Sequence, residues 1–234
     1  MNPDLILLGA AWYAIFVIST TCHEAAHAFT AYRLGDPTAH AGGQVSLLPT
    51  AHIKREPIGM VFIPIISYFL NGWMIGWAST PYNPDWARAY PKREIMMALA
   101  GPAANLILVL IAASLIRLGL ALGFFIPPES TTFSHITEAT TGGFANALAI
   151  LVSIMFMLNL VLFVFNLMPL PPLDGSSILP LILDERTAAM YKNFMSTPGI
   201  ALVGLIIAWQ VFGFIFGPIH TLALNLLYPG LHYS

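Results

Sequence analysis

A pattern of two histidines and a glutamate, His23-Glu24-Ala25-Ala26-His27, lies inside a long apolar stretch of the chain. An α-helix places residues i and i+4 on one face, so His23 and His27 can offer imidazole nitrogens to one tetrahedral zinc ion. Glu24 can hold a water molecule beside the metal and accept its proton. The spacing therefore predicts a hydrolytic zinc site. The alternative is a purely structural polar cluster, which is disfavoured because ionisable side chains cost several kcal/mol to bury in a membrane.

The predicted third zinc ligand is Asp174, which lies in the stretch Asn166-Leu167-Met168-Pro169-Leu170-Pro171-Pro172-Leu173-Asp174-Gly175. Three prolines stop a helix there and Gly175 permits a sharp turn, so Asp174 is displayed on irregular backbone. A catalytic zinc needs three protein ligands and one open position. We therefore predict that Asp174 completes a site for one zinc ion per chain. The alternative is that Asp174 caps a helical segment that starts near Ser176.

The composition excludes an ordinary soluble domain. Of the 234 residues, 57% are hydrophobic and 9% are charged, and the mean hydropathy is +0.76, whereas soluble domains carry about 25% charged residues. The single cysteine excludes an intramolecular disulfide, and a net charge of -2 gives no indication of nucleic-acid binding. We predict one membrane-embedded domain, residues 1–234, with a core at 5–183 and a C-terminal transmembrane helix at 199–227.

Four apolar stretches are long enough to cross a bilayer, at residues 5–33, 95–122, 144–168 and 199–227. The 18 residues from Leu5 to His23 make about 27 Å of helix, close to the roughly 30 Å thickness of the hydrocarbon core. The two histidines are therefore expected near the far end of the first span. The predicted fold class is an all-α polytopic membrane protein with about four transmembrane helices, a re-entrant segment and a short β-like edge strand.

The segment at 59–78 is apolar but is broken by Pro64, Asn71 and several glycines, so it either crosses the membrane or enters and returns. A full crossing would divide the basic residues four to five between the two sides. A re-entrant path places eight on one side, namely Arg33, Lys54, Arg55, Arg88, Lys92, Arg93, Arg186 and Lys192, and leaves only Arg117 opposite. Because cytoplasmic loops carry an excess of Lys and Arg, we predict the re-entrant path, in the cell membrane, with the zinc site toward the cytosolic face.

A polar, turn-rich stretch follows the first span and includes a segment expected to be extended, Gly42-Gly43-Gln44-Val45-Ser46-Leu47. An unpaired strand edge beside a metal can hold a peptide extended by β-augmentation. Gly43, Gln44, Val45 and Ser46 are therefore predicted to bind substrate. An ordinary loop is an equally good interpretation of this stretch.

Small residues begin the third apolar run, in the sequence Ala100-Gly101-Pro102-Ala103-Ala104-Asn105. They would allow close packing against the alanines of the first span. Asn105 then either hydrogen-bonds a ligand histidine or satisfies the backbone at the break made by Pro102. We also include Asn105 among the residues expected on the substrate side of the site.

Taken together, these motifs resemble the site-2 protease family of intramembrane zinc metalloproteases, peptidase family M50. The resemblance rests on His23–His27, on Gly101–Asn105 and on an N-x-x-P-x-x-x-x-D-G element at Asn166–Gly175, and it extends to 42–46 and 57–59. It is to the compact bacterial branch without PDZ or CBS domains. Relatives often carry a lysine after the Gly-Trp of the re-entrant stretch, whereas this chain has Gly76-Trp77-Ala78-Ser79, which leaves the role of that loop open.

The resemblance implies that His23, His27 and Asp174 bind zinc. It also implies that Glu24 is the general base and that Asn166 orients substrate or stabilises the oxyanion. The expected activity is hydrolysis of peptide bonds in or near transmembrane segments, with transmembrane proteins and the lipid bilayer as partners. Two rival functions are a membrane metal transporter and an inactive relative that binds membrane helices. Clustering of the predicted ligands near one face disfavours transport, and the intact Glu24 disfavours the inactive relative.

Overall fold

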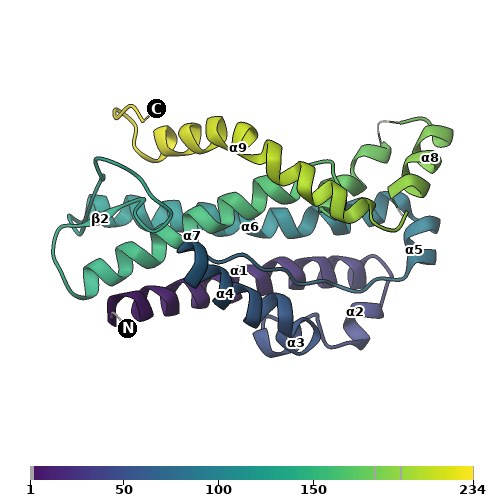
Figure 1. Ribbon diagram of the computed structural model, residues 1–234, viewed down its shortest axis with the longest axis horizontal. Coiled ribbons are helices and arrows are strands. Elements are labelled where there is room, and N and C mark those ends of the chain that lie inside the picture. The colour runs from purple at the N-terminus through teal and green to yellow at the C-terminus, as the bar shows by residue number, and fades with distance from the viewer. Residues whose placement is uncertain (1–2, 182, 196, 234) are drawn as a thin grey trace.

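The computed structural model describes residues 3–181, 183–195 and 197–233 of the chain. Within these residues, four helices are long and apolar enough to cross a membrane: α1 (Pro3–Arg33), α6 (Pro91–Ala121), α7 (Phe144–Asn166) and α9 (Ile200–Leu227). All four run roughly along the long axis of the molecule (Figure 1). The prediction of an all-α polytopic membrane protein is confirmed.

The helices α1, α6 and α7 pack against one another and form the centre of the molecule. One buried cluster joins α6 to α7 through residues such as Ile116 and Phe156. A second joins α1 to α7 through Trp12, Phe16 and Leu158. The same helices expose large apolar side chains on their outer faces, as expected for segments that face protein on one side and lipid on the other.

Helix α6 begins four residues earlier than the apolar run predicted, because Pro91 suits the first turn of a helix. The added first turn is polar, and its Arg93 donates a hydrogen bond of 2.9 Å from Nη1 to the carbonyl of Leu34, just beyond α1. This contact joins the start of α6 to the end of α1, at the end of the bundle where the two histidines lie.

Helix α9 lies at the periphery. Only 17% of its most apolar window is buried, so most of its surface is available to lipid. Gly204 of α9 lies close to the loop that follows α7, since an added Cβ would collide with the carbonyl oxygen of Pro171. That contact holds α9 against the loop that follows α7.

The segment predicted to be re-entrant begins with a π-helical turn, η1 (Ile58–Phe62), and continues as α4 (Ile63–Asn71). The Tyr68 hydroxyl in α4 donates to the carbonyl of Leu5 at 2.8 Å, near the start of α1. The chain then returns without helix, and the backbone N–H of Asn83 donates to Asp36 Oδ2 at 2.7 Å, beyond the end of α1. The segment therefore runs along α1 toward the start of that helix and back to its end, which is the hairpin course that a re-entrant path requires.

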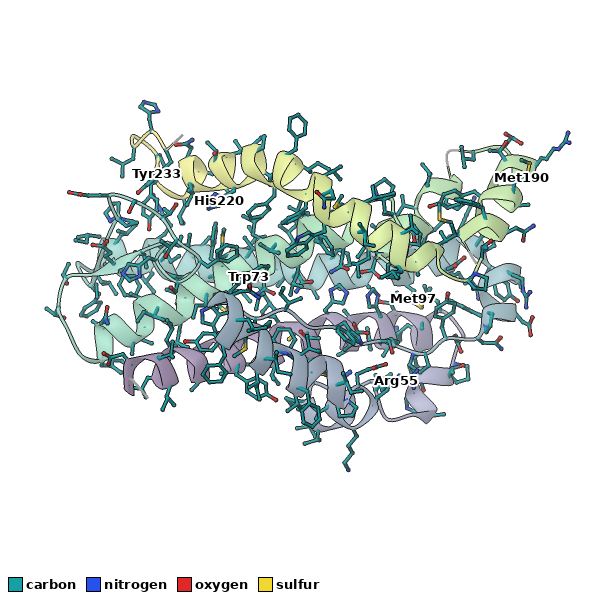
Figure 2. All side chains as sticks on the ribbon, in the orientation of Figure 1. Arg55, Trp73, Met97, Met190, His220 and Tyr233 are labelled. Carbon is teal, nitrogen blue, oxygen red and sulfur yellow. The ribbon has the colours of Figure 1, made fainter. Side chains whose placement is uncertain are left out.

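Aromatic stacking holds the turn of this segment against α9. Trp73, which lies two residues beyond the end of α4 and is labelled in Figure 2, stacks on Trp209 with ring centroids 5.9 Å apart. The returning stretch packs closely on the entering one, since Trp77 N–H donates to the carbonyl of Gly59 at 3.1 Å. A Cβ on Gly59 or Gly76 would collide with the opposite strand of this loop, so the close approach requires glycine at both positions.

The remaining elements are short. They are α2 (Thr38–Ala41), α3 (Pro49–Arg55), α5 (Pro84–Ala89), the antiparallel pair β1 (Phe125–Ile126) and β2 (Glu138–Ala139), the 3₁₀ turns η2 (Asp174–Ser177) and η3 (Leu179–Leu181), and α8 (Glu185–Met195).

The predicted edge strand at 42–47 is wrong, because these residues form turns and bends between α2 and α3. The N–H of Gly43 donates to the carbonyl of His40 at 2.9 Å, and the N–H of Gln44 donates to that of Ala39 at 2.9 Å. Gly43 has a φ of +73°. The two glycines therefore end a helix with a left-handed residue, which is a common use of glycine, and do not begin a strand.

Candidate metal centre

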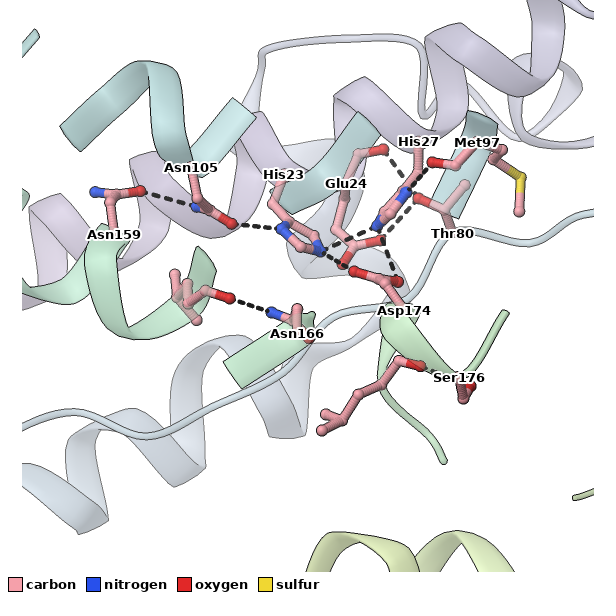
Figure 3. A network of polar contacts seen from close by, with 12 residues as sticks. His23, Glu24, His27, Thr80, Met97, Asn105, Asn159, Asn166, Asp174 and Ser176 are labelled. Atoms are coloured by element: carbon pink, nitrogen blue, oxygen red, sulfur yellow. Dashed lines mark hydrogen bonds and ion pairs between the residues drawn. The ribbon is translucent and has the colours of Figure 1, made fainter. Parts of the chain in front are cut away.

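Three side chains from two distant parts of the chain meet beside the bundle. The Nε2 atoms of His23 and His27 lie 3.0 Å apart. Asp174 Oδ2 lies 3.1 Å from His23 Nε2, and Asp174 Oδ1 lies 3.4 Å from His27 Nε2. In the described part of the chain, these residues form a group that could hold a metal ion, and Figure 3 shows their side chains converging.

Hydrogen bonds on the far side of each imidazole define which nitrogen faces the centre. His23 Nδ1 lies 2.6 Å from Asn105 Oδ1, and His27 Nδ1 lies 2.7 Å from the carbonyl oxygen of Met97. Both of these oxygens accept, so each Nδ1 carries the proton and donates it. In the neutral form of each imidazole, Nε2 is then the nitrogen with the lone pair, and the two Nε2 atoms lie 3.0 Å apart.

The donor set fits zinc. Zn–N bonds of about 2.0–2.1 Å in tetrahedral geometry separate two ligand atoms by about 3.3 Å, which is close to the three separations observed. Each oxygen of the Asp174 carboxylate faces one of the two imidazole Nε2 atoms. A single bound cation would satisfy the two imidazole nitrogens and the carboxylate together.

Gly101 of α6 makes room for this arrangement. A Cβ added there would collide with Nε2 of His27 and would lie 2.6 Å from Nε2 of His23. The sequence identified Gly101 only as one of several small residues that let helices approach. The structure shows the more specific reason, which is that the missing side chain leaves space for both imidazoles.

Glu24 is buried beside the ligands and is held by Thr80. The Thr80 hydroxyl lies 2.8 Å from Glu24 Oε2 and 3.0 Å from the Glu24 backbone oxygen, so it can donate to either. Thr80 is a residue that the sequence analysis missed. The sequence does contain a local indication that the chain around Thr80 is extended, because Pro81 and Pro84 bias the residues before them toward extended backbone.

A cavity of about 1350 Å³ opens in front of these residues. The polar residues that line it include His23, Glu24, His27, Thr80, Asn166 and Asp174. Its remaining walls are mainly apolar and come from the returning stretch of the re-entrant segment, from the loop after α7 and from α8 and α9. The cavity is therefore large enough for a peptide segment with apolar side chains.

The other predicted site residues lie in different places. Asn166 lines the cavity, but its amide donates to the carbonyl of Leu162 in its own helix at 3.0 Å. Asn105 has no exposed surface and contacts His23, so of the two roles first considered the structure shows the bond to a ligand histidine. Asn105 is not among the residues that line the cavity.

The residues predicted to bind substrate at 43–46 do not line this cavity. Gln44 is buried, and its Nε2 donates to the carbonyl of Ser79 at 3.2 Å. Through Gln44, the loop at 43–46 thus supports the returning stretch of the re-entrant segment without lining the cavity. The segment that lies along the cavity is the run from Ile75 to Thr80, which has no helix or strand pairing of its own.

The chain is similar in sequence to known proteins. The model of peptidase family M50 matches residues 11–209. The chain is 35% identical over 164 residues to "Putative zinc metalloprotease YwhC" of Bacillus subtilis, covering 70% of this chain and 64% of that protein. It is 30% identical over 182 residues to "Putative zinc metalloprotease Rip2" of Mycolicibacterium smegmatis, covering 78% and 59%. The chain thus spans less than two thirds of each. No solved structure matches it.

Proposed function

The chain belongs to peptidase family M50, and from that premise we propose that it is a zinc metalloprotease that hydrolyses peptide bonds in or beside membrane-spanning segments of other proteins. The observation that carries the proposal is the convergence of His23, His27 and Asp174 next to the buried Glu24, in a cavity bordered by apolar helices. Names of relatives that specify a zinc metalloprotease agree with it.

One zinc ion per chain would be held by His23, His27 and Asp174. When bound there, zinc would supply a Lewis acid that polarises a peptide carbonyl and lowers the pKa of water. Glu24 would accept the proton of the attacking water and deliver it to the leaving amine. Asn166 has a second amide N–H beyond the one given to Leu162, and this donor would stabilise the oxyanion.

The stretch from Ile75 to Thr80 is proposed to hold the substrate in extended form. The backbone of an extended segment points alternate residues to opposite sides. Ser67 Oγ binds the backbone of Ile75, Trp77 N–H binds Gly59, and the Ser79 carbonyl accepts from Gln44 and Arg55.

By this alternation, we infer that the intervening positions of this stretch turn their backbone the other way. Among the described residues, none hydrogen-bonds to the backbone of Gly76 or Ala78, and both residues line the cavity. Their N–H and C=O groups are available to pair with a peptide by β-augmentation.

The proposed location is the cytoplasmic membrane, with the site facing the cytosol. Elements that carry basic residues, among them α3, α5 and the start of α6, lie toward the end of the bundle that contains the metal ligands. The opposite end holds Arg117, whose Nη1 donates to the carbonyl of Leu227. This charge asymmetry supports the orientation. The expected partners are transmembrane proteins and lipid, and no nucleic acid.

The test is cleavage of a single-span model substrate by the purified chain in liposomes. Cleavage within or next to the span is expected, together with its loss after chelation and its return when zinc is added. Mass spectrometry of the products locates the cut, and zinc flux measured in the same liposomes tests transport. Cleavage that persists without metal, or zinc flux without cleavage, would contradict the proposal.

Thr80→Val is predicted to lower turnover by roughly 10- to 100-fold, because a hydrogen bond to a charged group contributes about 1.5–3 kcal/mol and valine cannot hold the Glu24 carboxylate. Thr80→Ser keeps the hydroxyl and serves as the matched control, with turnover close to wild type. The measurement is the initial rate on the model substrate at saturating zinc. Equal rates for the Val and Ser variants would show that the hydroxyl does not position Glu24.

A further inference from the structure

Behind His23, a series of buried side-chain amides runs from the metal centre into the bundle (Figure 3). Asn105 on α6 lies 2.6 Å from His23 Nδ1 through its Oδ1, and its Nδ2 donates to Asn159 Oδ1 on α7 at 2.8 Å. Asn159 Nδ2 in turn donates to Ser19 Oγ at 2.9 Å and to the Met155 carbonyl at 2.8 Å. Asn105, Asn159 and Ser19 have no exposed surface.

The orientation of each amide follows from the last contact in the series. The Met155 carbonyl can only accept, so the NH₂ group of Asn159 must face it and Asn159 Oδ1 must face the other way. That oxygen accepts from Asn105, which turns the NH₂ group of Asn105 toward α7 and its oxygen toward His23. The imidazole therefore carries its proton on Nδ1, and Nε2 is left with a lone pair toward the metal centre.

His27 is held in the same tautomer by a single hydrogen bond, because its Nδ1 faces the Met97 carbonyl directly at 2.7 Å. A backbone carbonyl cannot turn over. The Asn105 amide can, since its oxygen and nitrogen ends have nearly the same shape. If it turned, an N–H would face His23 Nδ1, and the proton would be favoured on Nε2, where it blocks metal binding. His23 thus depends on whatever prevents Asn105 from turning.

We propose that Asn159 is a positioning residue that locks the Asn105 amide and thereby keeps His23 Nε2 free to bind zinc; this inference rests on the zinc site proposed above. Asn159 is not among the residues that line the cavity, and its hydrogen bonds go to Asn105, Ser19 and Met155. It acts by offering an acceptor to Asn105 from a position that the Met155 carbonyl holds fixed. Ser19 lies one helical turn before His23 on α1, so the series also ties the ligand helix to α7.

The experiment measures zinc affinity of the full chain in detergent by competition with a chromophoric chelator. Outer hydrogen-bond partners of metal-binding histidines change affinity by about 10–100-fold, so Asn159→Leu, which keeps the branched shape without polar atoms, is expected to weaken zinc binding about tenfold. The absorption spectrum of the Co²⁺-substituted protein should change as well, because the geometry at His23 is altered. If Asn159→Leu does not fold, Asn159→Ala takes its place.

Two further variants separate positioning from general loss of stability. Asn159→Asp is expected to bind zinc nearly as well as wild type, because burial favours the protonated carboxyl, which donates to Met155 and accepts from Asn105. Ser153→Ala is the matched control on the same helix. Ser153 is also fully buried, and its Oγ accepts from the backbone N–H groups of Ile136 and Thr137, so its loss should lower the melting temperature and leave zinc affinity unchanged.

Wild-type affinity and Co²⁺ spectrum in Asn159→Leu would overturn the inference, and so would an equal loss of affinity in Ser153→Ala. Both outcomes leave the proposed function standing, since wild-type protein would still bind zinc. Failure of the wild-type chain to bind zinc at all would instead remove the proposed function, and this inference with it.

Discussion

Glu24→Gln is expected to reduce peptide hydrolysis by about 10²–10⁴-fold, which is the range contributed by a positioned general acid or base, while the protein keeps its zinc. Glutamine has the size of glutamate and can still accept a hydrogen bond from Thr80, but it cannot take the proton of the attacking water. The measurement pairs the initial rate of cleavage of the model substrate with the zinc content of the same preparation.

Glu56→Gln is the matched control for that variant. Glu56 Oε1 accepts a hydrogen bond of 2.6 Å from Ser79 Oγ, so Glu56 contacts the same stretch of chain as Glu24 does, but it lies outside the cavity lining. Its substitution should leave the rate close to wild type. Full activity of Glu24→Gln, or equal losses in the two variants, would rule out Glu24 as the proton acceptor.

Asp174→Ala is expected to release zinc. Binding free energies of about 10–16 kcal/mol for four-ligand zinc sites correspond to roughly 3 kcal/mol per ligand, so removing one should weaken affinity by about two orders of magnitude. Cleavage should be lost at low free zinc and partly return at high zinc, because the two imidazoles remain. Chelator competition and metal analysis after dialysis measure the effect.

Asp184→Ala provides the comparison for Asp174. Asp184 is exposed and its Oδ1 accepts from Thr187 N–H at 3.1 Å, at the start of α8. Its loss should weaken only that helix terminus and leave zinc affinity as in wild type. If Asp174→Ala also kept full affinity, Asp174 would be a structural residue and the third ligand would have to be sought elsewhere.

The histidine pair of the first span and the glycine pair at 42–43 differ in how far their spacing predicts local structure. The spacing of His23 and His27 sets their relation within one helix, and the fold does not alter it. The glycine pair at 42–43 is compatible with both a strand boundary and a helix end. In the structure the glycine pair forms a helix end, because the N–H groups of Gly43 and Gln44 donate to backbone carbonyls of α2.

The stretch that lies along the cavity shows the same dependence on context. Ile75 to Thr80 is apolar and rich in small residues, which is compatible with a membrane helix as well as with extended chain. Gly59 and Gly76 let the entering and returning strands approach within contact distance, and Gln44 and Arg55 bind the Ser79 carbonyl. These long-range contacts keep the stretch extended and place Thr80 against Glu24.

By itself, the sequence determined the membrane class, the four long helices and the helical face that carries His23, Glu24 and His27, because hydropathy and helical spacing act over neighbouring residues. Only the tertiary structure decided that Asn105 orients His23, that Gly101 accommodates the imidazoles and that Thr80 contacts Glu24. Those contacts join residues far apart in the chain, 82 positions apart for His23 and Asn105 and 56 for Glu24 and Thr80. They depend on how α6, α7 and the returning stretch pack against α1, which no local pattern specifies.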